Sequence, residues 1–463
     1  HGRVEKAMEV EPSSKAVSGF DVESYATRYA GNTRLLRLRH IAKIEPSLAA
    51  TAYQLLVQEM IHGLNVALYK ELQADAAARE HLGPLNEAWA EEATRRGAAE
   101  NDSFEVQLSH GKSSAAKEAI RQAYLGIADV AYRRGDGPLA LRYFSRARDY
   151  CTTHQHAADI FLRAIQASAD MRSFAQVTNY AAKADPMMDA LDADIKSRFS
   201  ASSGLAKLDD CQYHAAAKLF TSVAPEMGDS FNSVITADDV ATYGTLCTLA
   251  TCDRAECRRV LEQSAFKNFL SLKPQLQEIT QQILATRYGE AMRGLDALLP
   301  ELNMDLYLHR CATELVGMIR ERCIMQYFSP YLSVHLGSMA EAFATSLPEM
   351  ESTVAALIMK GNLAARIDSE KKTLHVREAE QRAESYRRVL ELSSSYLSEM
   401  KALLLRLSCK QQDFAVRNKH SMMGVLDSGS PAAASYPDAF YPGGNMQDSD
   451  APVPPSGFAD GLM

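Results

Sequence analysis

The stretch that most constrains the fold is residues 318–376, because helical and strand patterns alternate there in a fixed order. In residues 318–328 the apolar side chains recur at helical spacing, which predicts a helix with one buried face. Two further helical segments, 336–343 and 347–359, are joined by a short polar turn. We therefore expect three packed helices in this part of the chain.

Strand patterns lie on both sides of the last two helices. Residues 331–334 are aromatic and β-branched, which is typical of an edge strand. Residues 365–368 and 373–376 alternate in polarity across a polar turn, which predicts a β-hairpin. Three helices and a hairpin make a winged-helix module, a relative of the helix-turn-helix.

Residues 21–236 carry helical repeats. A small–large–small pattern precedes Gly135-Asp136 and continues after it, as in a tetratricopeptide-like helix pair. The pattern comprises Tyr124, Ile127, Ala128, Ala131, Ala140, Phe144 and Ala147, with further copies at Gly204, Ala216 and Phe220 and at Phe174, Val177, Ala181 and Ala184. Such pairs bury their apolar faces only by stacking, which predicts a solenoid.

Residues 379–412 contain neither Gly nor Pro and predict one long helix. Its apolar side chains recur at steps of three and four, as in a coiled-coil seam: Tyr386, Leu390, Leu397, Met400, Leu404 and Leu407. A single helix with such a seam needs a partner, so we expect it to join a helical bundle.

The predicted fold is therefore mostly α: a tetratricopeptide-like solenoid, a winged-helix module and a long C-terminal bundle helix. We expect domains at 21–236 and 237–378, the second with breaks at Pro274 and Pro300 and with the winged helix at 318–376. Residues 1–20 are unpatterned and 413–463 are Pro-rich, and we expect both to be disordered.

Catalytic motifs are missing from the sequence, and we predict no enzyme, no metal and no cofactor. There is no His-Glu-x-x-His, no phosphate-binding Gly-rich loop and no Gly-x-Ser-x-Gly elbow. His154-Gln155-His156 lacks the downstream Ser and Asp of a metalloprotease. Cys247, Cys252 and Cys257 are spaced by five residues, which would not put them on one helical face, so buried reduced thiols are expected.

Nucleic acid and membranes are disfavoured as ligands. The net charge is −8, and residues 318–376 contain six bases and six acids. The segment that would read DNA begins with Glu349 and Glu351, where phosphate binding needs unpaired positive charge. No apolar run reaches the roughly 18 residues of a membrane helix. A winged-helix nucleic-acid-binding protein stays as a less favoured alternative.

Binding to other proteins is the remaining function, and two sets of residues are candidates for the interfaces. Around the wing they are Tyr327, Phe328, Leu332, Val334, Ile367, Leu374 and Val376; on the seam they are Leu390, Leu397, Met400, Leu404 and Leu407. Sheet edges of a wing can be extended by a neighbouring module. Each wing residue can equally belong to the chain's own core, whereas the seam residues favour a partner.

Helical repeats followed by a winged helix resemble the PCI domain of the proteasome lid, the COP9 signalosome and a translation initiation factor. Within that group the chain is most similar to the subunit-one family of the signalosome, over roughly residues 21–410. The similarity is carried by four stretches: 146–153 (Arg-Ala-Arg-Asp-Tyr-Cys-Thr-Thr), 241–247 (Ala-Thr-Tyr-Gly-Thr-Leu-Cys), 326–331 (Gln-Tyr-Phe-Ser-Pro-Tyr) and 365–369 (Ala-Arg-Ile-Asp-Ser), the last followed by Gln381-Arg382.

The resemblance implies a non-catalytic scaffold subunit of a complex that removes Nedd8 from cullin–RING ubiquitin ligases, with the zinc isopeptidase in another subunit. It implies PCI contacts to subunits two and three, a C-terminal helical bundle, and N-terminal repeats that face ligase adaptors or substrate receptors. It also implies a nuclear and cytoplasmic location and, in plants, a role in photomorphogenesis. A proteasome-lid scaffold subunit with the same architecture is the alternative.

Overall fold

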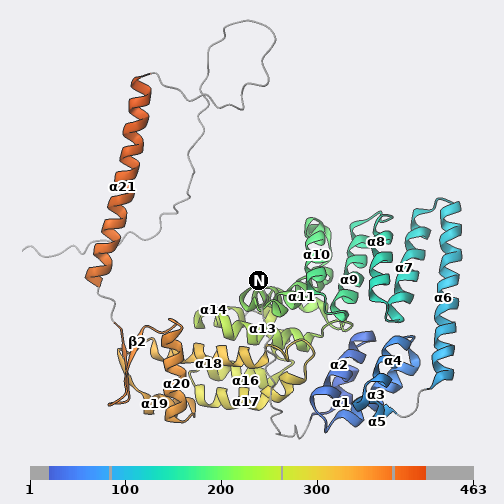
Figure 1. Ribbon diagram of the computed structural model, residues 1–463, viewed down its shortest axis with the longest axis horizontal. Helices are drawn as coiled ribbons and strands as arrows, with labels where there is room; N and C mark the ends of the chain where they lie inside the picture. Colours follow the sequence, from blue (N-terminus) through green and yellow to red (C-terminus); the bar gives the residue numbers. More distant parts are fainter. Residues whose placement is uncertain (1–19, 83–85, 262–263, 378–380, 413–463) are drawn as a thin grey trace, which may run out of the picture. The chain divides into compact units, whose positions relative to one another are not determined.

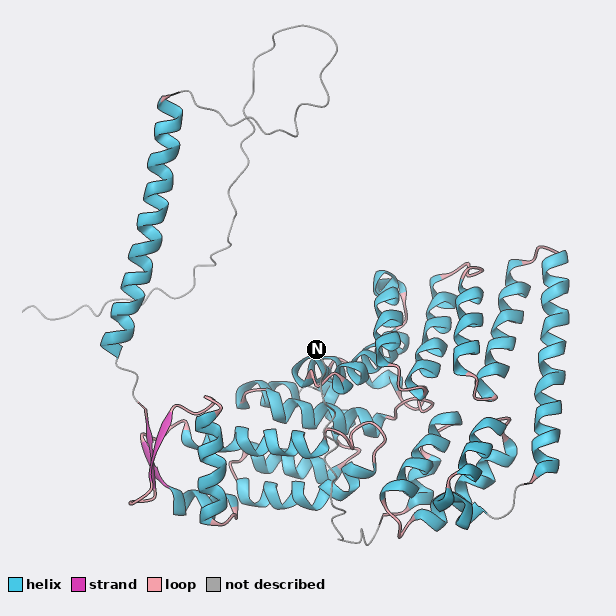
Figure 2. Ribbon diagram, viewed as in Figure 1, coloured by secondary structure: helices cyan, strands magenta, loops and turns pink. Residues whose placement is uncertain are grey.

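The computed structural model describes residues 20–82, 86–261, 264–377 and 381–412. The chain divides into two compact units, residues 1–378 and residues 379–463. The described residues are mostly helical, with one small sheet, which confirms the predicted fold class (Figures 1 and 2). Apart from Phe20, the arm predicted at 1–20 lies outside the described residues, as does the tail predicted at 413–463.

The first five helices pack around one apolar core that includes Leu38, Ile41, Leu56 and Leu72. They are α1 (Val22–Thr27), α2 (Gly31–Ile44), α3 (Ala49–His62), α4 (Val66–Ala74) and α5 (Ala76–Leu82). Asp21 begins α1, and its side chain accepts a hydrogen bond from the backbone N–H of Glu23. We call these five helices the N-terminal bundle.

The next helices pack one on another in chain order as an array, and those from α6 to α10 stand side by side in Figure 1. They are α6 (Glu87–Ser113), α7 (Lys117–Arg133), α8 (Gly137–Arg148), α9 (His154–Asp170), α10 (Phe174–Ala184), α11 (Ala193–Asp209) and α12 (Tyr213–Thr221), with short 3-10 turns η1 (Asp185–Ala190) and η2 (Pro225–Met227). The predicted pair around Gly135 is α7 and α8, and Asp136 caps α8. The repeat pattern is therefore confirmed.

Six helices continue the unit: α13 (Ala237–Thr251), α14 (Arg254–Leu261), α15 (Ser264–Leu270), α16 (Pro274–Leu284), α17 (Tyr288–Met304) and α18 (Ala312–Phe328). Pro274 starts α16, as expected. The break predicted at Pro300 is wrong, because this proline lies inside α17. A proline removes one intrahelical hydrogen bond, and packing of α17 on α16 and α18 compensates for that loss.

The winged helix completes the first unit with β1 (Ser333–His335), α19 (Leu336–Phe343), α20 (Leu347–Met359), β2 (Ala365–Asp368) and β3 (Thr373–Val376). Both short helices and both hairpin strands have the predicted bounds. The first helix, α18, begins at Ala312 rather than Met318, because Ala312, Leu315 and Val316 extend its buried face. The strands form one antiparallel sheet in the order β1-β3-β2, so β3 is central.

The second unit contains α21 (Gln381–Gln411), an unbroken helix as predicted. Among its described side chains only Cys409 is half-buried, and the others are exposed. Packing within the described residues therefore leaves the apolar side chains of α21 in contact with solvent.

Candidate interaction surfaces

The inner face of the wing sheet belongs to the chain's own core. Val334, Leu374 and Ile367 form one cross-strand row, because Leu374 on β3 pairs with Val334 on one side and Ile367 on the other. Leu374 is fully buried and Val334 is 9% exposed, while Ile367 is half-buried. Phe328 in α18 is also buried. For Phe328, Val334 and Leu374 the structure therefore favours the core alternative over a partner contact.

The outer edge of the wing is more accessible. Leu332, immediately before β1, is 75% exposed. Val376 is half-buried, and Tyr327 is half-buried against Phe343, with 5.7 Å between the ring centroids. Because β1 and β2 each pair on one side only, two strand edges are free among the described residues. Leu332 is thus the wing candidate best placed to meet another molecule.

The apolar face of α21 is wider than the predicted seam. All five seam candidates are 39–60% exposed: Leu390, Leu397, Met400, Leu404 and Leu407. The seam pattern missed five further exposed apolar residues: Val389, Leu392, Tyr396 and Leu403 adjoin the seam, and Leu405 lies about 60° beyond Leu390. The first four widen the face on one side. At 100° per residue the combined face covers roughly 160° of the helix. A face of this width can contact more than one neighbouring helix, whereas a two-stranded coiled coil uses a narrower seam.

A buried charged cluster joins the N-terminal bundle to the middle of the chain. Arg37 of α2 donates to Asp305 at 2.5 Å and to Asp239 of α13 at 3.0 Å. The exposed fraction is 1% for the Arg37 side chain, 9% for Asp239 and 11% for Asp305. Tyr29 covers the guanidinium, with its ring centroid 4.0 Å from Cζ. No pattern in the sequence indicated this cluster.

The two carboxylates of the cluster differ in environment. Asp305 also accepts hydrogen bonds from the Tyr243 hydroxyl at 2.6 Å and from the backbone N–H of Leu308 at 3.0 Å. Burial raises the pKa of Asp305, but Arg37 and these donors outweigh burial and hold that pKa below its usual value. Burial dominates at Asp239, whose pKa is raised. Asp305 is therefore the firmly ionised partner of Arg37.

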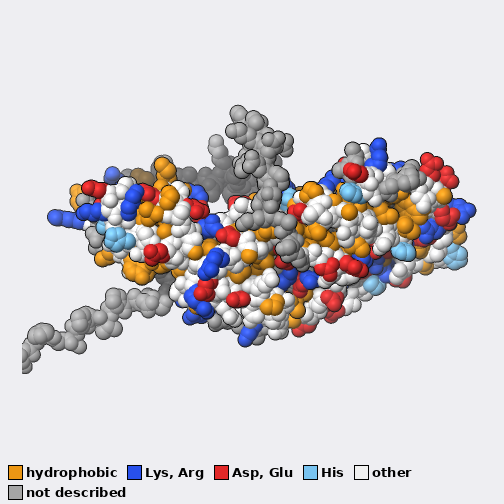
Figure 3. All heavy atoms as spheres, turned by 90° about the horizontal axis from the view of Figure 1, so that it is seen from below, with side chains coloured by type: hydrophobic (Ala, Val, Ile, Leu, Met, Phe, Trp, Pro, Cys, Tyr) orange, Lys and Arg blue, Asp and Glu red, His pale blue; other side chains and the backbone are white. Residues whose placement is uncertain are grey.

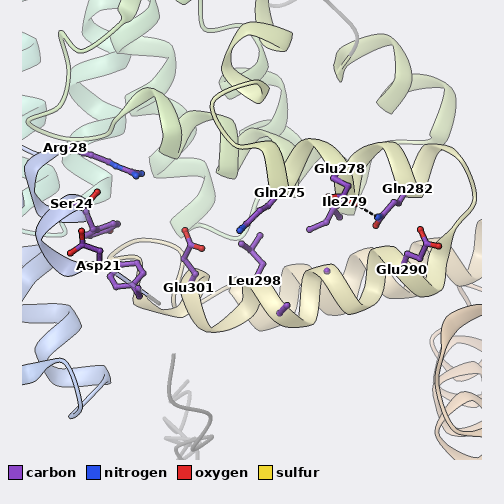
Figure 4. A pocket seen from close by; sticks show the side chains of 14 residues that line it. Asp21, Ser24, Arg28, Gln275, Glu278, Ile279, Gln282, Glu290, Leu298 and Glu301 are labelled. Carbon is purple, nitrogen blue, oxygen red and sulfur yellow. Dashed lines mark hydrogen bonds between the residues drawn. The ribbon is translucent and has the colours of Figure 1, made fainter. Parts of the chain in front are cut away.

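A groove of about 600 Å³ lies between α1 and the α16–α17 pair (Figure 4). Asp21, Ser24 and Arg28 come from the α1 side, and the opposite wall includes Glu278, Glu290 and Glu301. The charged groups already have partners: Glu301 accepts from Lys273 at 3.2 Å, Glu278 from Gln282 at 3.1 Å, and Arg28 pairs with Asp238 at 2.6 Å. We assign no acid–base role to this groove.

The cysteines singled out in the sequence are buried thiols, as predicted. Cys247 lies in α13, Cys252 follows the end of that helix and Cys257 lies in α14, so they do not share one helix. Burial raises the pKa of all three thiols, that of Cys257 to about 12. Within the described ranges no group of three or more His, Cys, Asp or Glu side chains could hold a metal ion.

Charge on the winged helix is largely neutralised by ion pairs. Arg320 pairs with Asp296 at 3.0 Å, Lys360 with Glu321 at 2.6 Å and Lys372 with Glu351 at 2.9 Å; Arg322 pairs with Asp253. Over the face drawn in Figure 3, acidic and basic side chains are interspersed. None of the helices that the structure describes is long and apolar enough to cross a membrane.

Two family models match the chain. The model described as 26S proteasome subunit RPN7 matches residues 86–260, and the PCI domain model matches residues 295–378. The first match covers the whole helical array and continues through α13 into α14, and the second covers the end of α17 and the winged helix. A 26S proteasome non-ATPase regulatory subunit 6 from Caenorhabditis elegans is 20% identical over 65% of this chain and 75% of its own length.

Higher identity is found with COP9 signalosome proteins. COP9 signalosome complex subunit 1 of Arabidopsis thaliana is 34% identical over 87% of this chain and 92% of its own length. Subunit 1b of Drosophila melanogaster is 31% identical over 86% of both chains. Subunit 1 of Emericella nidulans is 32% identical over 86% of this chain and 83% of its own length.

Proposed function

The chain belongs to the COP9 signalosome subunit 1 family, and from this membership we propose that it is a non-catalytic scaffold subunit of a multi-subunit signalosome complex. The COP9 signalosome removes Nedd8 from cullin–RING ubiquitin ligases, with the zinc isopeptidase in another subunit. This chain contributes surfaces that organise the complex.

One observation carries the scaffold proposal: α21 exposes an apolar face of roughly 160° to solvent. Burying such a face stabilises association by about 25 cal/mol per Å² of apolar area removed from water. Partner helices in a bundle supply that burial. In the proposed arrangement, Leu390, Leu397, Met400, Leu404 and Leu407 pack against helices of other subunits.

The free strand edges of the wing supply the second contact. A strand of a neighbouring PCI module adds to the outer edge of β1 or β2 through main-chain hydrogen bonds. Leu332 lies beside the β1 edge and packs on the neighbour. We propose subunits two and three as these neighbours, and ligase adaptors or substrate receptors as partners of the helical array. We propose a location in the nucleus and cytoplasm, and a role in photomorphogenesis where the organism is a plant.

The bundle contact is tested by Leu397→Asp with Leu404→Asp, which places two charges on the apolar face of α21. We expect this variant to fold, because both side chains are exposed, and to fail to enter the complex. The matched control is Ser395→Asp with Ala402→Asp, which has the same spacing on the opposite face. Native pull-down with sizing and mass spectrometry measures incorporation.

The same pull-down separates the alternatives. Recovery of the wild-type chain with a zinc isopeptidase subunit and cullins supports the signalosome role. Recovery with proteasome ATPases assigns the chain to the proteasome lid. A family model of a 26S proteasome subunit also matches residues 86–260. Normal incorporation of the Leu397/Leu404 variant contradicts the bundle contact, and a monomer that carries nucleic acid contradicts the scaffold role.

A further inference from the structure

The second helices of the repeat pairs carry positive charge without acidic side chains. Helices α8, α10 and α12 contain no Asp or Glu, and their basic residues are Arg142, Arg146, Arg148, Lys183 and Lys218. All five are exposed. The whole chain has a net charge of −8, so these three helices are positive in a chain that is negative overall.

Tyrosines lie among these cations. Tyr124 of α7, Tyr143 of α8, Tyr150 after α8 and Tyr180 of α10 all pack on one core cluster. The Tyr124 ring centroid is 6.3 Å from that of Tyr143 and 5.9 Å from that of Tyr150. Tyr124, Tyr143 and Tyr150 are therefore neighbouring rings, and Tyr180 packs on the same core cluster.

Three cations are held over these rings. Lys112 Nζ lies 5.7 Å from the Tyr124 centroid, Arg146 Cζ 5.4 Å from that of Tyr143, and Lys183 Nζ 5.1 Å from that of Tyr180. Such contacts order long side chains without neutralising their charge. None of these three cations forms an ion pair with a described carboxylate, whereas Arg148 pairs with Asp149 at 3.4 Å. Three positive charges are thus ordered and available.

We infer that this tyrosine–cation surface, made by the four tyrosines with Lys112, Arg146, Arg148 and Lys183, binds an acidic segment of a partner protein. Carboxylates of such a segment accept charge-assisted hydrogen bonds from Arg146 and Lys183. Tyr143, Tyr150 and Tyr180 are half-buried and contribute apolar ring surface and hydroxyl donors to the same segment, whereas Tyr124 is buried.

A protein segment fits this surface better than a nucleic acid does. Single-stranded nucleic acids bind through bases that stack on exposed aromatic faces. Here one face of Tyr124, Tyr143 and Tyr180 is covered by a cation, and Tyr124 also lies against two other rings. Nucleobases would have to displace those contacts before they could stack on the rings. Carboxylates can pair with the cations without any such rearrangement. The surface lies on the helical array, so this inference rests on the proposed function and specifies the chemistry of the segment that the array would bind.

The test is fluorescence anisotropy of the full-length chain with a labelled Asp/Glu-rich peptide. The variant is Arg146→Glu with Lys183→Glu, which reverses two exposed charges. The matched control, Lys267→Glu with Arg293→Glu, makes the same change in net charge at exposed cations of α15 and α17. A conservative variant, Arg146→Lys with Lys183→Arg, keeps the charge.

We expect the wild-type chain and the conservative variant to bind the peptide, and the charge-reversal variant to bind about tenfold more weakly. The control variant should bind as the wild type does. Absence of peptide binding by the wild-type chain overturns the inference, as does equal weakening in the control. A labelled single-stranded oligonucleotide of equal charge serves as competitor, and tighter binding of the oligonucleotide at this surface also overturns the inference. Circular dichroism establishes that each variant is folded.

Discussion

Arg37→Met tests how the N-terminal bundle is attached to the rest of the first unit. Methionine keeps much of the side-chain volume but removes the charge that faces Asp239 and Asp305. Removing one partner of a buried ion pair costs about 3–5 kcal/mol, because the other charge remains buried and unpaired. Two carboxylates are left here, which places the expected loss in the free energy of unfolding at the upper end of that range.

Neutralising both carboxylates in the same chain should recover most of this loss. In the triple variant Arg37→Met, Asp239→Asn, Asp305→Asn no buried charge remains, so the residual destabilisation should fall to about 1–2 kcal/mol for altered hydrogen bonds. In the wild-type background Asp305→Asn should destabilise more than Asp239→Asn, because the pKa of Asp305 is held low and that of Asp239 is raised. The carboxylate that stabilises the cluster when ionised is thus Asp305.

Urea unfolding followed by the emission of Trp89 is the assay. Trp89 is the one tryptophan of the chain, it packs against the core of the N-terminal bundle, and its indole N–H donates to the Ile61 carbonyl at 3.0 Å. Arg34→Met is the control on the same helix: Arg34 pairs with Glu59, both side chains are partly exposed, and the substitution should cost about 1 kcal/mol or less. The reasoning is refuted if Arg37→Met costs no more than the control, or if the triple variant is no more stable than Arg37→Met.

Two further predictions concern the contacts of the bundle with the helical array. Gly135→Ala should lower the free energy of unfolding by about 1–3 kcal/mol, because φ is +85° and the added Cβ would lie 2.5 Å from Asn65 Oδ1. Gly361→Ala, with φ +77° and open space, is its control, and an equal loss in both by urea unfolding would contradict a contact effect. Asp170→Asn should remove a pH dependence of the free energy of unfolding. Burial raises the pKa of Asp170 to about 7, so its favourable contribution is full below about pH 4 and is lost as the pH rises to about 7, by roughly 4 kcal/mol. The melting temperature of the variant should therefore rise relative to that of the wild type between about pH 4 and pH 7, and a constant difference would contradict the assignment.

Local patterns predicted the winged helix closely. Helices α19 and α20 and strands β2 and β3 have the expected bounds, because polar turns interrupt each apolar run. The start of α18 was placed too late, since its upstream turn carries Gly and Thr among the apolar residues. The division of the wing candidates into core and surface also required the sheet register, which sets Leu374 between Val334 and Ile367.

Long-range polar contacts could not be predicted. Arg37 reads as an ordinary surface cation of an amphipathic helix, and its partners lie 202 and 268 residues away. On α21 the seam pattern included only part of the exposed apolar side chains, because heptad steps of three and four exclude Val389, Leu392 and Leu403. The resemblance to a known family identified the chain from its sequence. Which side chains are buried and which are exposed could be learned only from the structure.

The separation between Arg37 and Asp305 has a consequence during synthesis. At about 5–20 residues per second, Arg37 is made roughly 13–54 s before Asp305, so the N-terminal bundle emerges from the ribosome long before its guanidinium can be neutralised. During that interval the α2 face that will be buried stays open to solvent. The N-terminal bundle can complete its docking only once α13 and the loop after α17 have been translated. The first helices of the chain are therefore among the last to reach their final packing.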